Sequence, residues 1–175
     1  MRKLLILATP VLAGLLLACN PAFNWREFTS KDASWQATFP DKPATASRDI
    51  NLGGSKTTMT MTGAEVGDIL FAVGQADAAD PALVGAGLDA MQTALVSNIS
   101  GTVTRSASAS ASNNGAARLS RDIDATGSRN GKPLRLVAHF EARGRTLYQV
   151  IVVGPPGAIK PEQTEQFIGS FKVLK

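Results

Sequence analysis

Short glycine-containing turn signals recur along the chain and separate runs in which polar and apolar residues alternate. They are Gly-Gly at 53–54, Asn-Asn-Gly at 113–115, Asn-Gly at 130–131 and the glycine at 144. Asn-Gly and Gly-Gly pairs adopt positive φ angles at low cost, as a tight turn between antiparallel strands requires. A chain divided in this way is expected to fold mainly as antiparallel β-hairpins.

The runs between these signals have the period of two that is typical of strands with one buried face. One of them, "DILFAVG", is continuously apolar and is also predicted to be a strand. The predicted strands cover residues 35–39, 47–52, 56–62, 68–74, 103–112, 119–125, 134–142, 146–153 and 171–174.

The Ser-Ala alternation at 106–112 allows two interpretations, because a low-complexity run of small residues also fits a flexible linker. Its period of two continues that of Val103 and Arg105, and a turn signal follows it at 113–115. We therefore predict two antiparallel strands on either side of this turn.

The longer of two predicted helices covers residues 81–99. Pro81 suits a first helical position, and apolar residues then recur at spacings of three and four, which gives one apolar stripe. Glycines at 85 and 87 weaken the first turns, so regular helix is expected only from about Leu88.

A second, short helix is predicted at 161–169, with Phe167 and Ile168 facing inward. The predicted order along the chain is a run of strands, a helix, four more strands, a helix and a final strand. This order predicts the α+β class: an antiparallel sheet with one longer and one short helix packed on it, in a single domain over residues 28–175.

The N-terminus has the features of a secretory signal peptide. Arg2 and Lys3 give it a positive start, and residues 4–18 are mainly apolar. As a helix this stretch rises about 22 Å, which is short of the ~30 Å hydrocarbon core of a bilayer. A signal peptide over residues 1–18 is therefore predicted instead of a permanent membrane span.

The signal ends in Leu-Leu-Ala-Cys at 16–19, which resembles the lipobox of bacterial lipoproteins. The resemblance implies cleavage between Ala18 and Cys19, a diacylglyceryl group on the Cys19 sulfur and a further acyl chain on the new amine. Two or more such chains make a stable anchor. We expect Cys19 to be the lipidation site and residues 19–27 to be a tether.

The mature chain is nearly neutral. Of the 18 basic residues, Arg2 and Lys3 leave with the signal, so 16 remain against 14 acidic residues, a formal charge of about +2. This balance removes the electrostatic case for a nucleic-acid partner. Asn20, where an aspartate would favour inner-membrane retention, predicts sorting to the outer membrane.

Two segments resemble PsbP-like and DcrB-like domains. They are "FTSKDASWQATFPDKP" at 28–43, read as strand, turn and strand, and "RTLYQVIVVGPPGAIKPEQTEQFIGSFKV" at 145–173. The resemblance implies an α+β sandwich of the PsbP-like kind. It also implies a protein that binds or assists larger assemblies and is not a catalyst.

His139 is the single histidine, so any histidine-dependent catalysis rests on it. It shares a strand face with Glu141, and such a pair can transfer protons. The alternative is an ordinary solvated strand residue, which we expect here. No Gly-x-Ser-x-Gly elbow is present, and acylation would occupy the Cys19 thiol. We predict no catalytic residues; a small hydrolase using His139 and Glu141 is the alternative.

Metal and cofactor sites are not expected. Asp77, Asp80 and Asp89 supply oxygens of the kind that calcium binds, but Asp80 directly precedes Pro81 and is predicted to cap the helix. Asp122 and Asp124 lie two apart on a strand face and are expected to meet basic neighbours.

Arg135, Arg143 and Arg145 give a basic cluster near the turn at 144. Two roles fit such a cluster: contact with anionic lipid heads beside the anchor, or a solvated hairpin tip, which we expect.

The expected function is that of a lipid-anchored lipoprotein facing the periplasm, which binds an envelope protein without catalysis. A second alternative is a carrier of an apolar ligand between sheet and helix. The small residues Ala107, Ala109 and Ala111 leave room for such a ligand.

Overall fold

The computed structural model describes residues 23–32, 34–113 and 116–174. The predicted signal peptide, the cleavage site at Ala18, the lipidation site Cys19 and the sorting residue Asn20 lie outside these residues. Within the described part, no helix is both long and apolar enough to cross a bilayer.

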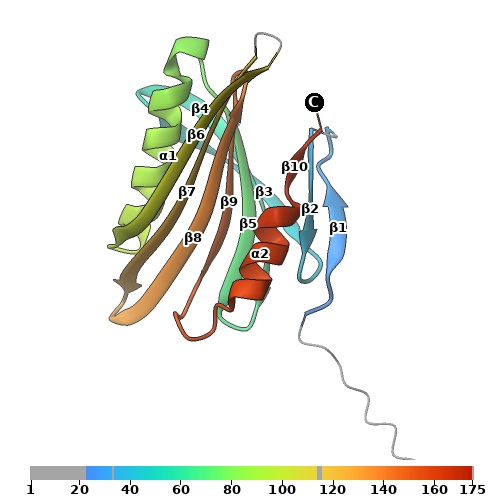
Figure 1. The fold of residues 1–175 in the computed structure, drawn as a ribbon, viewed down its shortest axis with the longest axis vertical. Coiled ribbons are helices and arrows are strands. Elements are labelled where there is room, and N and C mark those ends of the chain that lie inside the picture. The colour runs from blue at the N-terminus through green and yellow to red at the C-terminus, as the bar shows by residue number, and fades with distance from the viewer. Residues whose placement is uncertain (1–22, 33, 114–115, 175) are drawn as a thin grey trace, which may run out of the picture.

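A seven-stranded sheet forms the body of the molecule (Figure 1), and every neighbouring pair in it is antiparallel. Its spatial order is β3 (Ala44–Leu52), β4 (Ser55–Val66), β5 (Ile69–Asp77), β9 (Thr146–Gly154), β8 (Lys132–Arg143), β7 (Ala116–Arg129) and β6 (Thr102–Asn113). The turn signals thus join neighbouring strands, as predicted, and the Ser-Ala run is part of strand β6.

The turn between β7 and β8 requires the backbone angles that an Asn-Gly pair adopts easily. Asn130 has φ 52° and Gly131 has φ 76°, the positive angles that a tight two-residue hairpin requires. The turn sets the register, in which Arg129 lies opposite Lys132 and every later pair follows.

A second, three-stranded sheet corrects the prediction of a single sheet. It consists of β1 (Arg26–Thr29), β2 (Trp35–Phe39) and β10 (Lys172–Val173), with β2 in the middle. The final strand pairs with β2, more than a hundred residues earlier in the chain. Local turn signals say nothing about pairing between such distant segments.

The longer helix, α1 (Val84–Asn98), follows a short 3₁₀ turn, Pro81–Leu83, and so begins before Leu88. The glycine at 87 is used for packing: a Cβ placed there would lie 2.6 Å from Leu147 Cδ1. Its lack of a side chain lets the helix approach the sheet closely, which outweighs its low helix propensity. As predicted, the Asp80 side chain caps this turn by accepting a hydrogen bond from the Ala82 amide at 2.8 Å.

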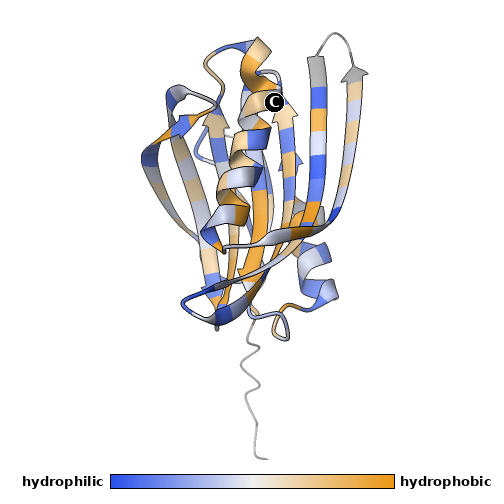
Figure 2. Cartoon of the chain, turned by 90° about the vertical axis from the view of Figure 1, so that its left-hand side faces the viewer, coloured by the Kyte–Doolittle hydropathy of each residue, from blue (hydrophilic) through white to orange (hydrophobic). Residues whose placement is uncertain are grey.

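One face of the large sheet packs against α1, which lies in front of the strands in Figure 2. Leu88 and Met91 of the helix meet Leu136, Phe140 and others from the sheet in one apolar cluster, whose buried members are all at most 8% exposed. The contact between α1 and the sheet therefore has a packed apolar core.

The opposite face is covered over part of its width by the small sheet and by α2 (Pro161–Ser170). Here the core is aromatic: Phe167 of α2, with its ring 5.2 Å from that of Phe39 and 5.4 Å from that of Phe71, is fully buried. Ile168 is half-buried at the edge of the same cluster. The helices thus pack on opposite faces of the large sheet.

Residues 23–27, the described part of the segment expected to be a tether, pack on the domain. The Phe23 and Trp25 rings stack with centroids 5.9 Å apart, and both meet the edge of Phe71. The Asn24 amide donates to the Pro40 carbonyl at 2.7 Å. Residues 23–27 therefore belong to the folded domain.

Candidate functional site

At strands β6, β7 and β8, no layer formed by the described residues covers part of the sheet face opposite α1. The register places on one face the side chains that we call the charged face. Its members are Arg105, Ala107, Ala109, Ala111, Arg118, Ser120, Asp122, Asp124, Arg135, Val137, His139, Glu141 and Arg143. The Asn-Gly turn at 130–131 brings the acidic residues of β7 beside the basic residues of β8.

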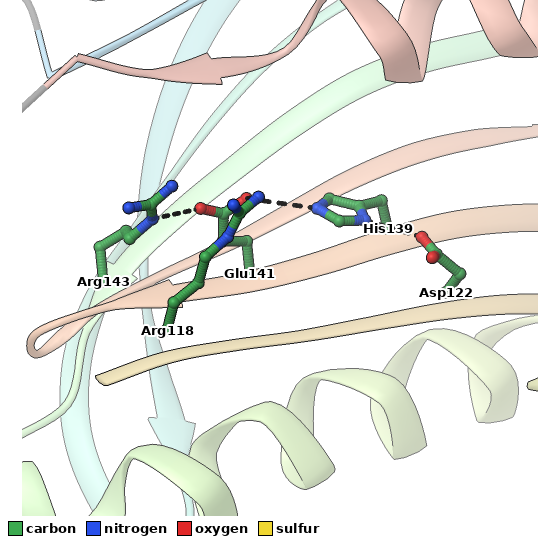
Figure 3. A network of polar contacts seen from close by, with 5 residues as sticks. All are labelled: Arg118, Asp122, His139, Glu141 and Arg143. Atoms are coloured by element: carbon green, nitrogen blue, oxygen red, sulfur yellow. Dashed lines mark hydrogen bonds and ion pairs between the residues drawn. The ribbon is translucent and has the colours of Figure 1, made fainter. Parts of the chain in front are cut away.

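Glu141 is the centre of the larger polar network on this face (Figure 3). Only 4% of the residue is exposed, which is unusual for a carboxylate. Arg143 donates to its Oε1, and Arg118 Nη2 lies 3.2 Å from its Oε2. His139 Nε2 lies 3.4 Å from the same Oε2. Burial is tolerated because both carboxylate oxygens have cationic or hydrogen-bonding partners.

His139 lies between two carboxylates. Its Nδ1 is 2.7 Å from Asp122 Oδ1, and its other nitrogen faces Glu141. The His139 side chain is only 17% exposed, so the expectation of a solvated strand residue is wrong. The cross-strand neighbour Asp122 and the packed sheet cover most of the ring.

The network shifts the pKa of both central groups. Burial alone raises the pKa of Glu141, but hydrogen bonds from His139 and Arg143 and the charges of both arginines outweigh it and lower the pKa to about 2. Burial alone lowers the pKa of His139, but the hydrogen bonds and charges of Glu141 and Asp122 raise it above its ordinary value. Glu141 is therefore a carboxylate at neutral pH and a very weak base.

A second, smaller cluster lies on the same face. Arg135 binds Asp124 with two hydrogen bonds, from Nε at 3.0 Å and from Nη2 at 2.6 Å. This bidentate pair raises the pKa of Arg135. Arg105 reaches the same carboxylate only at 3.8 Å, and its side chain is 79% exposed. Asp122 and Asp124 thus meet basic partners, as predicted.

A groove of about 610 Å³ runs between α2 and the charged face. Val137 and Ala107 supply apolar surface from the sheet, and Ile168 supplies it from the helix. Arg105 and Arg135 line it as well, with other polar groups. A concave surface with apolar patches and a few charged groups is suited to binding.

The arginines that were grouped by sequence do not form one cluster. Arg135 pairs with Gly154 at one end of β8, whereas Arg143 pairs with Thr146 at the other end, next to Arg145. Eight residues along a strand span about 26 Å. The grouping rested on distance in sequence, and an extended strand separates its two ends.

The alanines expected to border a cavity beneath α1 face the other way. Ala107, Ala109 and Ala111 lie opposite Asp122, Ser120 and Arg118, on the charged face. Between α1 and strands β6 and β7 the structure has a separate pocket of about 240 Å³, whose lining includes Leu88, Ser108 and Leu119. The groove beside α2, at about 610 Å³, is the larger of these two spaces.

The aspartates considered for calcium have other partners. Asp80 caps the helix, Asp77 accepts a hydrogen bond from Thr146, and Asp89 pairs with Arg121 at 2.8 Å. Within residues 23–32, 34–113 and 116–174, no three histidine, cysteine or acidic residues are grouped closely enough to hold a metal ion.

Sequence reasoning did not identify Arg118 as part of the site, nor the burial of Glu141. One signal was available for the pair of Asp122 and His139. A two-residue hairpin turn at 130–131 implies that paired residue numbers add to the same total, and these two residues satisfy it.

Comparisons with known proteins identify the fold. No family model and no curated protein matches the sequence. The solution structure of cyanobacterial PsbP (CyanoP) from Synechocystis sp. PCC 6803 aligns with a TM-score of 0.52 and 8% identity, over 92% of this chain and 98% of that one. A putative regulator of unknown function from Pseudomonas aeruginosa aligns at TM-score 0.32 and 12% identity, over 76% of this chain and 84% of that one. The likeness to CyanoP, together with the antiparallel sheets and packed helices, shows that this chain has a PsbP-like fold.

Proposed function

We propose that this protein is a non-catalytic binding module, held at a bacterial membrane by lipid on Cys19 and facing the periplasm. Its charged face and the groove beside α2 bind a protein of the cell envelope. The observation that carries the proposal is the uncovered charged face itself, whose central charges are fully paired around the buried Glu141.

The state of the charged groups supports binding over hydrolysis. A general base works best with a pKa near the working pH, whereas the pKa of Glu141 is about 2. Arg118, Arg143 and His139 already occupy its oxygens. The hydrolase alternative would need His139 to act while both of its nitrogens face carboxylates.

The position of Phe23, the first residue that the structure describes, supports a lipid anchor on Cys19. Phe23 packs on Phe71, and only four peptide steps separate it from Cys19. Four residues reach at most about 14 Å, so an anchored domain would lie close to the membrane. The turn that carries Arg143 and Arg145 is at the other end of β9 from Val152, which pairs with Phe71. This position opposes a role for these two arginines in binding lipid heads beside the anchor.

The anchor is tested by the Cys19→Ser variant. We expect the wild-type protein to partition into the detergent phase and the membrane fraction, and the variant to lose both. Asn20 places the anchored form in the outer membrane, which density separation of the two membranes would check. A Cys19→Ser protein that still partitions fully would contradict the anchor.

The binding face is tested by photo-crosslinking in intact cells. A photoreactive residue is placed at Val137 in the groove, and a matched one at Thr58 on β4, outside the charged face. We expect one envelope protein to be captured from position 137 in the anchored form and not from position 58. Equal capture from both positions would remove the support for this face.

The hydrolase alternative is tested by His139→Ala. We expect the variant to keep its crosslinked partner and its role in the cell, because His139 contributes packing and charge and no chemistry. Complete loss of the cellular role in a variant that still folds would favour the enzyme.

The carrier alternative keeps one supporting observation, the apolar surface of Val137 and Ile168 in the groove of about 610 Å³. Mass spectrometry of lipids extracted from the purified protein separates it from the binding module. A stoichiometric apolar molecule, lost in a Val137→Glu variant, would favour the carrier.

A further inference from the structure

Strand β6 forms an open edge of the large sheet. It is the last strand in the order β3-β4-β5-β9-β8-β7-β6, and within the described part of the chain it pairs on one side only, with β7. Figure 2 shows it as the outermost strand at the right, pale along most of its length. Residues 104–111 are all exposed. The outward amide and carbonyl groups of such an edge are a template for pairing with another strand.

The opposite edge, β3, is protected in the usual ways. Pro43 precedes it, and Arg48 and Asp49 place opposite charges in its middle. On β6, a bulge at residues 103–105 and the charge of Arg105 protect only the first part. Ser106 to Ala111 carry neither charge nor proline. Since charges and prolines are how natural proteins block edge pairing, the two edges differ in what they permit.

Arg105 provides a positive charge at this edge that can contact a second chain. It is 79% exposed and reaches Asp124 only at 3.8 Å, and Asp124 is already bound at 2.6 Å by Arg135. Asp122, two residues along β7 on the same face, is 65% exposed despite its contact with His139. The exposed Arg105 on the edge strand β6 of one copy and the exposed Asp122 on the neighbouring strand β7 of another copy have complementary charges.

We propose that β6 pairs with β6 of a second copy of this chain, antiparallel and in register about Ala107. Arg105 then lies opposite Ala109 of the second copy. The alanine methyl leaves the guanidinium free to extend across it to Asp122 of that copy, and symmetry repeats the contact. A parallel pairing would instead place the two Arg105 side chains against each other, so the charges select the antiparallel arrangement.

The pairing is closed. Both β6 edges are used, and the protected β3 edges at the two ends do not continue the sheet, so a dimer forms and not a fibre. A single strand pair buries less than the ~800 Å² per partner of a standard interface, so the contact is weak in dilute solution. The proposal rests on the proposed function in one respect: anchors in the same membrane raise the local concentration of the two copies.

A disulfide at the symmetry axis tests the register. In Ala107→Cys, two cysteines opposite each other across an antiparallel pair are within the range that a disulfide spans. We expect a dimer on non-reducing gels from intact cells, which reducing agent removes. The matched control is Ser47→Cys on the β3 edge, and the parent protein controls for Cys19; both are expected to stay monomeric. A monomer from Ala107→Cys, or a crosslink to a protein of another mass, overturns the proposal.

A charge exchange tests the contact without any added cysteine. Sedimentation of the purified full chain in detergent measures the dissociation constant of the dimer. We expect Arg105→Glu to raise it by about tenfold or more, because an attraction becomes a repulsion at two symmetric places. The double variant Arg105→Glu with Asp122→Arg is expected to restore it, while Lys56→Glu, away from this edge, leaves it unchanged.

Circular dichroism confirms that each variant is folded before its mass is interpreted. The proposal is overturned if the wild-type chain is monomeric at every concentration, or if Arg105→Glu leaves the dissociation constant of the dimer unchanged. These outcomes are independent of the anchor, because partition of Cys19→Ser into detergent is a separate measurement. A lipid-anchored protein that never dimerises would leave the proposed function standing.

Discussion

The face of the large sheet opposite α1 has two halves that are held together by different physical means. Over β4, β5 and β9, the small sheet and α2 bury an aromatic core in which Phe39, Phe71 and Phe167 are 0% exposed. Over most of β6, β7 and β8 the described residues form no layer on the sheet, and buried or half-buried charges pair instead. The covered half supplies stability, and the uncovered half keeps its charges in place while remaining accessible to a partner.

Truncation in the covered half should have the largest effect. Phe167→Ala removes a ring that meets Phe39 and Phe71 at 5.2 and 5.4 Å and holds α2 on the sheet. We expect the free energy of unfolding to fall by about 3–5 kcal/mol, measured by chemical denaturation. Leu174→Ala, at an exposed position, is the control and should change it by less than about 0.5 kcal/mol. A loss below about 1 kcal/mol for Phe167→Ala would mean that the aromatic half is not the stabilising one.

Acid should destabilise the uncovered half. The pKa of Glu141 is 4.5 in an unfolded chain and about 2 in the fold, so the stability it contributes is fully present above pH 4.5. That contribution, about 3 kcal/mol from the size of the shift, is lost as the pH falls from about 4.5 to about 2. Unfolding free energies measured at steps of pH between 7 and 2 would show it.

The contribution of Asp32 to stability is lost in the same acid range, so it must be separated from the contribution of Glu141. Burial alone raises the pKa of Asp32, but hydrogen bonds from Ser30, Ser34 and Gln75 lower it to about 2. The comparison that isolates Glu141 is wild type against Glu141→Gln, since both proteins keep Asp32. Equal slopes of stability against pH in the two proteins would contradict the assignment to Glu141.

At neutral pH, Glu141→Gln should cost less than the loss of the Phe167 ring. The amide keeps the shape but leaves Arg118, Arg143 and His139 facing one another without the central negative charge. We expect a loss of about 1–3 kcal/mol in unfolding free energy, because a hydrogen bond to a charged group is worth that much. Glu65→Gln, exposed on β4, is the matched control and should be nearly neutral.

The two halves also differ in how far sequence could predict them. The uncovered half consists of consecutive hairpins, so the Asn-Gly turn alone sets the register that brings Asp122 beside His139. Alternation then places Glu141 on the same face. Alternation does not predict that Glu141 is buried. Strand β9 lies on the side of β8 away from β7, and its Tyr148 lies opposite Glu141.

The covered half depends on contacts between segments that are distant in sequence. β10 pairs with β2, and Phe167 packs on Phe39. Turn chemistry and periodicity describe each of these elements separately and carry no information on which sheet face receives them. Gly87 is a further example. Its low helix propensity can be predicted from the sequence, but its close packing against Leu147 can be known only from the structure.

The smallest expected effect is on His139, and it has a direct spectroscopic measurement because the chain contains one histidine. The pKa of His139 lies above its ordinary value of 6.5, so its contribution to stability is full below pH 6.5 and is lost as the pH rises through the folded pKa.

Asp122→Asn removes one of the two carboxylates that face the His139 ring and keeps a hydrogen-bond acceptor. We expect the pKa of His139 to fall, as followed by the imidazole NMR signals, while the unfolding free energy changes by less than about 1 kcal/mol because Asp122 is 65% exposed. An unchanged pKa would mean that Glu141 alone holds the proton on the ring. In that case the charged face would depend on one buried carboxylate, and Asp122 would be left free to bind across the β6 edge.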